Sequence, residues 1–362
     1  MSDQPYFTVD GNRLRLMTEG PDRMAALIDL IAGAQTSLRV LFYIYVDDDA
    51  GRAVGDALAA AAARGVSVSL IVDGLGSEAA AQQRFFEPLV AAGVNVCRFI
   101  PRWGRRYLLR NHQKLAIADG EGDAPRLIMG GFNVEDAYFG TVEQQAWRDL
   151  GLYVEGPAAA RITGYFDALS RWSRLRRAPI RALDKLLCDW SEPQGAPVRW
   201  LLGGPVRRLS PWARLVRAEM LSATRIDLIA AYFAPNPAML RRLGDVAARG
   251  GVRLILPALA DHTAAIWGAR FTYAGLLRRG VCIYEYQRTK LHTKLFVADD
   301  AVHIGSSNFD IRSLFLNMEL MLRIEDAAFA AHVRAYVEGE IAGSEAITPA
   351  LHASRNGPVR RI

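Results

Sequence analysis

Two histidines and two lysines define the chemistry that this chain could carry out. His112 and Lys114 stand two residues apart, and His292 and Lys294 repeat that spacing. Side chains two residues apart on a strand point to the same face, so each pair would place an imidazole and an ammonium group in one cavity. Imidazole can act as a nucleophile or move a proton near neutral pH, and ammonium groups bind anions. The spacing therefore predicts an anion site suited to phosphodiester chemistry.

The residues that follow each pair repeat as well. Each HxK is followed by a carboxylate and then by a turn of small residues that ends in asparagine. These residues are Asp119, Gly131 and Asn133 in the first copy and Asp299, Ser306 and Asn308 in the second. The two copies of HxKxxxxD lie 180 residues apart. A short pattern that occurs twice in register is far more specific than one that occurs once, so the chain is predicted to be a duplication.

These motifs resemble the signature of the phospholipase D superfamily, in which HxKxxxxD and a following G(G/S)xN occur twice in one chain. Longer segments resemble the bacterial cardiolipin synthase branch, including FYIYVDDDAGR at 42–52, GGFNVEDAYFG at 130–140 and RSLFLNMEL at 312–320. The likeness runs from about residue 11 to about residue 340. The first motif has about four extra residues before Gly130 and the second is about one residue short before Gly305. Both departures fall in expected hairpin turns, so they affect turn geometry more than chemistry.

The resemblance implies a covalent phosphohistidine intermediate with His112 as the nucleophile and His292 as the acid and then the base. The residues by themselves leave the reverse assignment open. Fixed donors from both motifs would neutralise the phosphate oxygens, which is the electrostatic part of the catalysis. The expected donors are Lys114, Lys294, Asn133, Asn308, Ser306 and, through its backbone N–H, Gly131.

Four carboxylates are candidates for support of the histidines and their turns. A catalytic imidazole needs an acceptor at its far nitrogen, and the family pattern places carboxylates at Asp149 and Glu319. We expect each of these two to orient one catalytic imidazole. For Asp119 and Asp299 the sequence leaves two roles open, because each could belong to the catalytic set or could brace the turn of its motif.

The length and the order of predicted elements indicate two α/β units. A chain of 362 residues exceeds the usual size of one hydrophobic core. Strands predicted at 37–45 and 66–72 recur at 225–233 and 252–256, with helices predicted between them. We expect residues 1–195, including a basic connector, and residues 196–362 to form two phospholipase D-like domains. The resemblance implies that each is a β-sheet flanked by helices, with the active site at their interface.

Charge and cysteine content narrow the classes of partner. The net charge of +6 favours an anionic partner, either lipid head groups or nucleic acid. The three cysteines lie far apart without CxxC spacing, so neither a zinc site nor a disulfide framework is indicated. Lysine is a poor metal ligand, so we expect no metal and no other cofactor at the histidines. A reduced, cytoplasmic compartment is the simplest interpretation.

Membrane contact is expected from outside the bilayer. No apolar run reaches the length of about 18 residues that a spanning helix needs, and no secretory signal is recognisable. A basic aromatic loop before the first HxK is expected at the rim of the site, where it would bind head groups unless it is merely a solvated loop. Its residues include Trp103, Arg105, Arg106 and Tyr107. The basic segment 171–200 is either a surface helix on anionic lipid or a connector with a buried apolar side.

Three activities fit these residues. The first is transfer of a phosphatidyl group between two phosphatidylglycerol molecules, which yields cardiolipin and glycerol at the inner membrane surface. The second is hydrolysis to phosphatidic acid. The third, a metal-independent nuclease, is disfavoured because the basic residues accompany Trp, Tyr and Leu, as at membrane surfaces. An inactive binding protein is disfavoured because no motif residue is missing.

Overall fold

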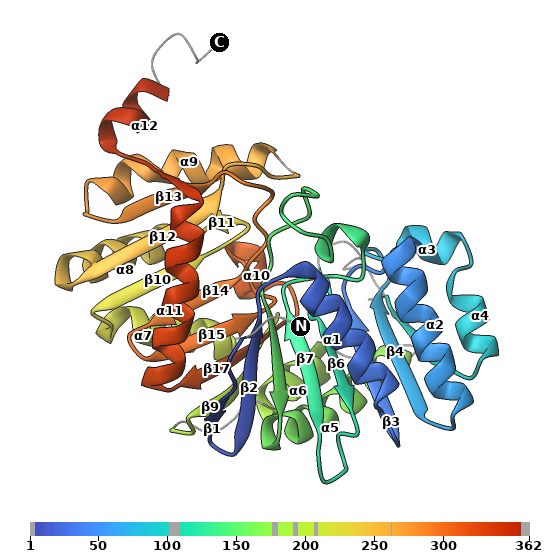
Figure 1. The fold of residues 1–362 in the computed structure, drawn as a ribbon. Helices are drawn as coiled ribbons and strands as arrows, with labels where there is room; N and C mark the ends of the chain where they lie inside the picture. Colours follow the sequence, from blue (N-terminus) through green and yellow to red (C-terminus); the bar gives the residue numbers. More distant parts are fainter. Residues whose placement is uncertain are drawn as a thin grey trace.

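The computed structural model describes residues 4–100, 109–175, 180–190, 195–205, 209–261 and 263–355. Its strands form two sheets of eight strands each and one small sheet of two strands (Figure 1). The first large sheet is drawn in blue and green and the second in yellow to red. Helices flank both large sheets, which confirms the predicted α/β class with two repeated units.

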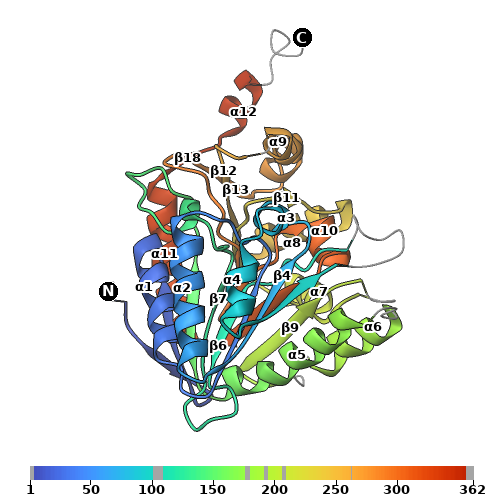
Figure 2. The same ribbon diagram turned by 90° about the vertical axis from the view of Figure 1, so that its right-hand side faces the viewer.

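The first sheet has the strand order β1-β2-β8-β7-β6-β3-β4-β5. Its strands are β1 (Phe7–Val9), β2 (Asn12–Met17), β3 (Ser37–Phe42), β4 (Ser67–Asp73), β5 (Asn95–Phe99), β6 (Leu115–Ala118), β7 (Arg126–Gly130) and β8 (Gly151–Glu155). The helical segments of this half are α1 (Gly20–Ala32), α2 (Asp49–Ala63), α3 (Glu78–Gln82), α4 (Phe86–Ala91), η1 (Asp136–Tyr138) and α5 (Pro157–Arg174). Helices α1 and α2 cover the face of this sheet that points away from the second half of the chain. Helix α5 packs on the opposite face, toward the core that the halves share (Figure 2).

The second sheet has the order β18-β13-β12-β10-β14-β15-β17-β9. Its strands are β9 (Val198–Gly203), β10 (Arg225–Ile229), β12 (Gly251–Pro257), β13 (Cys282–Tyr286), β14 (Leu295–Ala298), β15 (Ala301–Gly305), β17 (Glu319–Glu325) and β18 (Ser344–Ala346). Strands β11 (Phe233–Ala234) and β16 (Phe309–Asp310) form the small sheet. The helices are α7 (Pro211–Ser222), α8 (Pro237–Arg249), α9 (Thr263–Leu277), α10 (Ile311–Phe315), α11 (Ala327–Ala342) and α12 (Pro349–Arg355).

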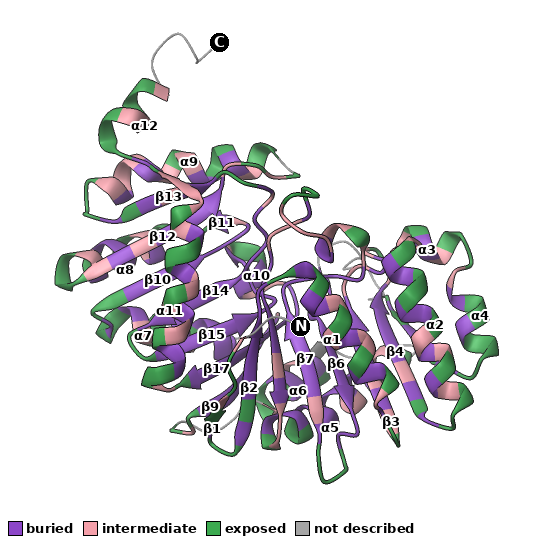
Figure 3. Ribbon diagram, in the orientation of Figure 1, coloured by how far each residue is buried: buried purple, intermediate pink, exposed green. Residues whose placement is uncertain are grey.

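The duplication is visible in the pairing of the strands. In the first sheet β3, β4 and β5 are parallel and β6 runs antiparallel to β3. In the second sheet β10, β12 and β13 are parallel and β14 runs antiparallel to β10. β6 and β14 are buried at every position (Figure 3), as expected for central strands covered on both faces. Each HxK therefore leads into a fixed, central strand.

The two halves share a hydrophobic core. One cluster of buried side chains contains Leu115 and Met129 from the first half together with Leu295 and Ile304 from the second. Two further clusters lie under the outer helices, one in each half. Strand β15 also contacts β7 and β8 directly. The halves are thus packed as one body, with the HxK strands close to the shared core.

The connector between the halves has its apolar side buried. Helix α6 (Ile180–Asp189) follows α5, and Leu183 and Leu187 are fully buried in the shared core while the side chain of Lys185 is mostly exposed. The indole of Trp200 donates to the carbonyl of Ala158 at 2.8 Å, which ties the connector's end to α5. The buried connector is therefore the arrangement that the structure shows. The boundary between residues 195 and 196 falls between α6 and β9 and stays a prediction.

Two features bear on the expected membrane contact, the rim loop before the first HxK and the length of the helices. The rim residues Trp103, Arg105, Arg106 and Tyr107 lie outside the described residues. Within the part of the chain that the structure describes, each helix is too short or too polar to cross a bilayer.

Candidate active site

The backbone attaches each HxK segment to the opposite half. The N–H of His112, just before β6, donates to the carbonyl of Met318 at 2.9 Å. The N–H of His292, just before β14, donates to the carbonyl of Arg148 at 2.7 Å. Met318 precedes Glu319 and Arg148 precedes Asp149 in the sequence. Each histidine is therefore placed beside a carboxylate from the other half.

The carboxylates contact the histidines in this crossed arrangement. Nδ1 of His112 lies 3.1 Å from Oε2 of Glu319, and Nδ1 of His292 lies 2.6 Å from Oδ2 of Asp149. Both carboxylates are fully buried. When Nδ1 carries the proton and donates it to the carboxylate, Nε2 keeps its lone pair for a nucleophile or base. The sequence located both carboxylates, and the structure shows that each serves the histidine of the opposite motif.

Direct contacts join the two motifs around one space. Nδ1 of His112 is 3.1 Å from the carbonyl oxygen of Ser306, in the second motif. The amide Nδ2 of Asn133, in the first motif, donates to the hydroxyl of Tyr138 at 3.0 Å. That hydroxyl lies 3.5 Å from Nε2 of His292. Residues 154 and 194 positions apart in sequence thus meet at one site.

Both lysines are buried beside their own histidines. Nζ of Lys114 donates to the carbonyl of His112 at 2.5 Å, and Nζ of Lys294 donates to the carbonyl of His292. Nζ of Lys294 also lies 2.9 Å from Nδ1 of His292. A side chain at Gly131 would meet Cδ of Lys294 at 3.0 Å, so Lys294 reaches across to the first motif. Both amino groups are therefore buried beside the histidine motifs, and burial lowers the pKa of Lys114 well below its ordinary value.

The site favours neutral histidines. Burial, followed by the charge of Lys294, lowers the pKa of His292 to about 3. Burial likewise lowers the pKa of His112, and it lowers the pKa of Lys294 to about 8. Burial would raise the pKa of Asp149, but the charges of Lys294 and His292 and the hydrogen bond from His292 lower it. The arrangement consists of two imidazoles that favour the neutral form, each in contact with a buried carboxylate.

The small-residue turns support the carboxylates. The hydroxyl of Ser306 donates to Oε2 of Glu319 at 2.5 Å and accepts the N–H of Leu320 at 3.0 Å. At the equivalent position a Cβ on Gly131 would lie 2.5 Å from Oδ1 of Asp149, so there is no room for a serine. The N–H of Gly131 donates to the carbonyl of Leu150 at 3.4 Å, which leaves it less free for phosphate than the sequence suggested.

The two asparagines have different surroundings. Oδ1 of Asn133 accepts the N–H of Ile44 at 3.1 Å, which fixes its amide toward Tyr138. Oδ1 of Asn308 is buried and has no hydrogen-bond partner in the described part of the chain. Both side chains are buried beside the histidine motifs, where a phosphate could use their amide N–H groups.

Asp119 and Asp299 lie at the far ends of the motif strands. Each follows its strand in a backbone conformation with positive φ, 53° and 46° respectively. Asp119 accepts the N–H groups of Gln35, Thr36 and Ser37, and Asp299 accepts those of Thr224 and Arg225. Seven residues of extended chain separate each from its histidine by roughly 20 Å. This placement fits a brace for the turn and not contact with a phosphate held between the histidines.

Aromatic rings around the histidines were not singled out by the sequence. Tyr138 and Trp147 pack on the ring of His292, with centroids 5.1 and 5.3 Å away. Tyr43 packs on His112 at 4.8 Å and lies 5.1 Å from Nζ of Lys114. These residues occur in the family-like segments FYIYV, DAYFG and WRD, which was the available signal. The rings exclude water from the imidazoles and so contribute to the lowered pKa values.

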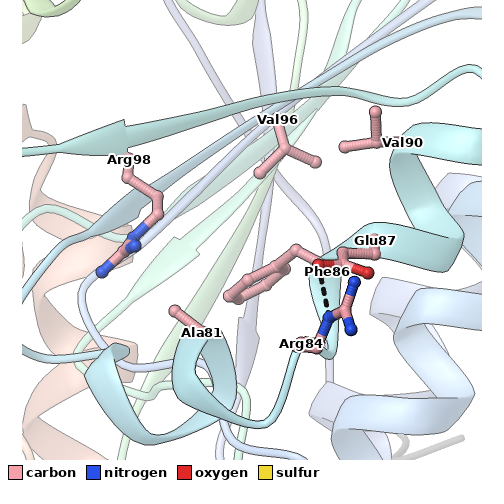
Figure 4. Close-up of a pocket in the computed structure, with 7 residues that line it drawn as sticks. All are labelled: Ala81, Arg84, Phe86, Glu87, Val90, Val96 and Arg98. Carbon is pink, nitrogen blue, oxygen red and sulfur yellow. Dashed lines mark hydrogen bonds and ion pairs between the residues drawn. The ribbon is translucent and has the colours of Figure 1, made fainter.

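Other sites in the structure differ from this one. Among the described residues, no cluster of three or more His, Cys, Asp or Glu side chains has an arrangement that could hold a metal ion. A surface pocket of about 470 Å³ lies between α3, α4 and β5 (Figure 4). Its lining includes Phe86, Val90, Arg84 and Arg98 and contains neither histidine. The pocket is separate from the candidate active site.

The fold and the paired HxK motifs define a two-domain enzyme of the phospholipase D class. A family model described as "Cardiolipin synthase, PLD-like domain" matches residues 27–170 and 216–341. The chain belongs to this cardiolipin synthase family. It is 32% identical over 352 residues to cardiolipin synthase A of Pseudomonas aeruginosa, covering 94% of this chain and 69% of that protein. It is 30% identical to the major cardiolipin synthase of Bacillus subtilis, covering 91% and 69%.

Solved structures support the same fold. Phosphatidylserine synthase from Haemophilus influenzae aligns with a TM-score of 0.75 at 13% identity, over 99% of this chain and 92% of that chain. Polyphosphate kinase from Porphyromonas gingivalis aligns with a TM-score of 0.63 at 15% identity, over 95% and 49%. These structures support the fold, and the family model and the relatives in sequence confirm the resemblance to the phospholipase D superfamily and its cardiolipin synthase branch.

Proposed function

We propose that the chain transfers a phosphatidyl group from one phosphatidylglycerol molecule to another, which produces cardiolipin and free glycerol. The observation that carries this proposal is the crossed pairing of His112 with Glu319 and of His292 with Asp149. It supplies two oriented imidazoles at one anion site, which a double displacement at phosphorus needs. The family relationship supports a phospholipid substrate.

In the first step Nε2 of His112 attacks phosphorus. The bond from phosphorus to the glycerol oxygen of the head group breaks, and His292 gives that oxygen its proton. In the second step His292 removes the proton from a hydroxyl of the second phosphatidylglycerol. That oxygen attacks phosphorus, the phosphorus–nitrogen bond breaks and His112 is regenerated. Lys114, Lys294 and the amides of Asn133 and Asn308 hold the non-bridging oxygens throughout.

Substrate binding prepares His292 for its role as an acid. Without an anion, burial and the charge of Lys294 lower its pKa to about 3. A phosphodiester between the lysines adds a negative charge beside the imidazole, so it raises this pKa. The proton is then held by a group that Asp149 already orients. Asp119 and Asp299 position the strands and do not touch the substrate in this proposal.

The substrate reaches the site from a membrane surface. We infer peripheral attachment to the cytoplasmic side of the inner membrane, with anionic phospholipids as partners. The mild positive charge of the chain supports this attachment, because anionic leaflets attract basic surfaces.

The test is incubation of the purified chain with phosphatidylglycerol vesicles, followed by mass spectrometry of the lipids with and without EDTA. We expect cardiolipin and glycerol in equal amounts, no effect of EDTA, and a phosphorylated protein adduct that His112→Ala abolishes. Phosphatidic acid as the main product would replace transfer by hydrolysis. Cleavage of an oligonucleotide without lipid turnover would overturn the proposal, and an adduct that survives in His112→Ala would reassign the nucleophile.

A further inference from the structure

Helix α9 exposes aromatic side chains to solvent. Its inner side packs on the second sheet through Ile266, Ala269, Tyr273 and Leu276, which are buried. Its outer side presents Phe271, which is 91% exposed, and Trp267, which is 53% exposed. These two residues are four positions apart and therefore lie on one helical face. A helix that is apolar on both sides is normally fully buried, so this outer face is an exception.

The charged side chains on this helix and directly after it are arginines, two of which pair with carboxylates of neighbouring elements. Thr263–Leu277 contains no carboxylate, and its one charged residue, Arg270, holds its guanidinium 5.8 Å from the ring centroid of Trp267. Arg270 also pairs with Glu285 at 2.7 Å, which fixes it beside the helix. Arg278 and Arg279 follow the helix and are exposed, and Arg279 pairs with Asp245 at 3.7 Å. The face thus combines aromatic rings with a basic border and matches the interfacial zone of an anionic bilayer.

The position of α9 relates this face to the active site. The helix starts beyond the carboxyl end of β12, and the segment with His292 follows the carboxyl end of the parallel strand β13. Helix α9 also packs on β11, whose partner β16 begins directly after Asn308. In Figures 1 and 2, α9 lies beside β11 at one end of the molecule. A membrane against α9 would therefore lie at the end of the second sheet where the parallel strands β12 and β13 finish and the segment with His292 begins.

We propose that Trp267 and Phe271 form a membrane-binding surface that inserts into the head-group region of an anionic phospholipid bilayer. The proposal rests on the proposed function, in which the substrate is a membrane lipid. Aromatic side chains gain free energy when they leave water for the interface, and the arginines add attraction to anionic head groups. The surface would hold the chain at the bilayer with its HxK site next to the lipid.

A second copy of the chain is the other occupant to consider. Two aromatic side chains bury at most about 150–250 Å² each, whereas a stable dimer buries about 800 Å² per partner. The face is therefore too small by itself for a stable subunit interface. A bilayer needs only shallow insertion combined with electrostatic attraction.

The test uses Phe271→Glu in a His112→Ala background, so that the lipid is bound without being turned over. Sedimentation with vesicles of phosphatidylglycerol and phosphatidylcholine should show a loss of binding of about tenfold or more, because a ring that inserts into the bilayer is replaced by a charge. Phe271→Trp should retain binding. The matched control is Leu221→Glu on α7, where an exposed leucine on a different helix also receives a charge.

The outcomes separate this proposal from the proposed function. Equal vesicle binding with and without Phe271→Glu would overturn the membrane surface. A concentration-dependent dimer that Phe271→Glu dissociates, with no change in vesicle binding, would overturn it in favour of a subunit contact. Lack of phosphatidyl transfer by the unmodified chain would contradict the proposed function, whereas Phe271-dependent vesicle binding in the same preparation would still support the surface.

Discussion

His292 couples the chemistry of the site to the stability of the fold. Its imidazole is buried 2.9 Å from the ammonium group of Lys294, and its pKa of about 3 lies below the ordinary value of 6.5. Between these values the unfolded chain binds a proton that the folded chain does not bind. The free energy of unfolding therefore falls as the pH is lowered through this window, and the full contribution is present only above about pH 6.5.

We predict that His292→Asn flattens the pH dependence of stability between about pH 5 and pH 6.5. One such group contributes a slope of at most about 1.4 kcal/mol per pH unit. Urea unfolding of the unmodified and variant chains across this range measures the difference. The lowered pKa of Asp149 acts at lower pH and does not interfere. Identical slopes in the two proteins would show that His292 titrates normally in the folded chain.

The crossed carboxylates lead to a second prediction. Glu319→Gln removes the negative acceptor from His112 while it keeps the size of the side chain, so the transfer rate should fall by about 100-fold or more. The matched control is Glu325→Gln at the other end of β17, where the carboxylate pairs with Arg323. Initial rates of cardiolipin formation check the result. A rate near that of the unmodified chain for Glu319→Gln would remove this carboxylate from the mechanism.

At the scale of elements, Asp119 connects two strands through their ends. Its carboxylate accepts backbone N–H groups at the start of β3, and its backbone has a φ of 53° that asparagine tolerates. Asp119→Asn should therefore lower the free energy of unfolding by roughly 1–2 kcal/mol with little change in the rate per folded molecule. Chemical denaturation and initial rates measure both effects.

The control for this prediction lies in the same turn. Asp123 is exposed, so Asp123→Asn should change stability by less than about 0.5 kcal/mol. A loss of activity in Asp119→Asn without a loss of stability would assign Asp119 to the chemistry.

The sequence predicted the helices and strands well where apolar residues recur at the spacing of a helix or a strand. The strands expected at 37–45 and 66–72 are observed as Ser37–Phe42 and Ser67–Asp73. The strand expected at 225–233 divides into β10 and the two-residue β11, which pairs with β16 in a separate sheet. A two-residue strand has no period of its own, and its partner lies over 70 residues away in the sequence. The small sheet could therefore not be read from the local pattern.

At the scale of the whole molecule, a buried ion pair joins the halves. The guanidinium of Arg148 lies 2.6 Å from Oε1 of Glu340 on α11, and Glu340 is buried. Removing Glu340 leaves the largely buried guanidinium of Arg148 with Glu19, at 2.7 Å, as its remaining acidic partner. Glu340→Ala should therefore lower the free energy of unfolding by about 3 kcal/mol, the lower end of the range for a broken buried pair. Denaturant unfolding checks this value.

The same helix provides the comparison. Glu338 is exposed and pairs with Arg253, so Glu338→Ala should cost less than about 1 kcal/mol. Equal losses for the two variants would mean that the contact between the halves contributes little to stability.

The sequence predicted the candidate site residues from the repeated motifs and from the family pattern, but it did not specify how they pair. The repeat pointed to His112 and His292, and the family pattern pointed to Asp149 and Glu319. A spacing pattern contains no information about contacts between positions 143 or 207 residues apart. The same limit applies to Tyr138, whose hydroxyl approaches His292 only after the halves pack. Local patterns thus predicted which residues belong to the site, whereas tertiary packing determines which of them are in contact.

The exchange of carboxylates between the halves restricts how such a chain can be altered by recombination. A half transplanted from a distant relative brings a histidine whose acceptor must come from the resident half, together with the backbone carbonyl next to that acceptor. Chimaeras joined at the connector should therefore be active only when the two parents agree in the strands that meet at the junction, even if every motif residue is retained.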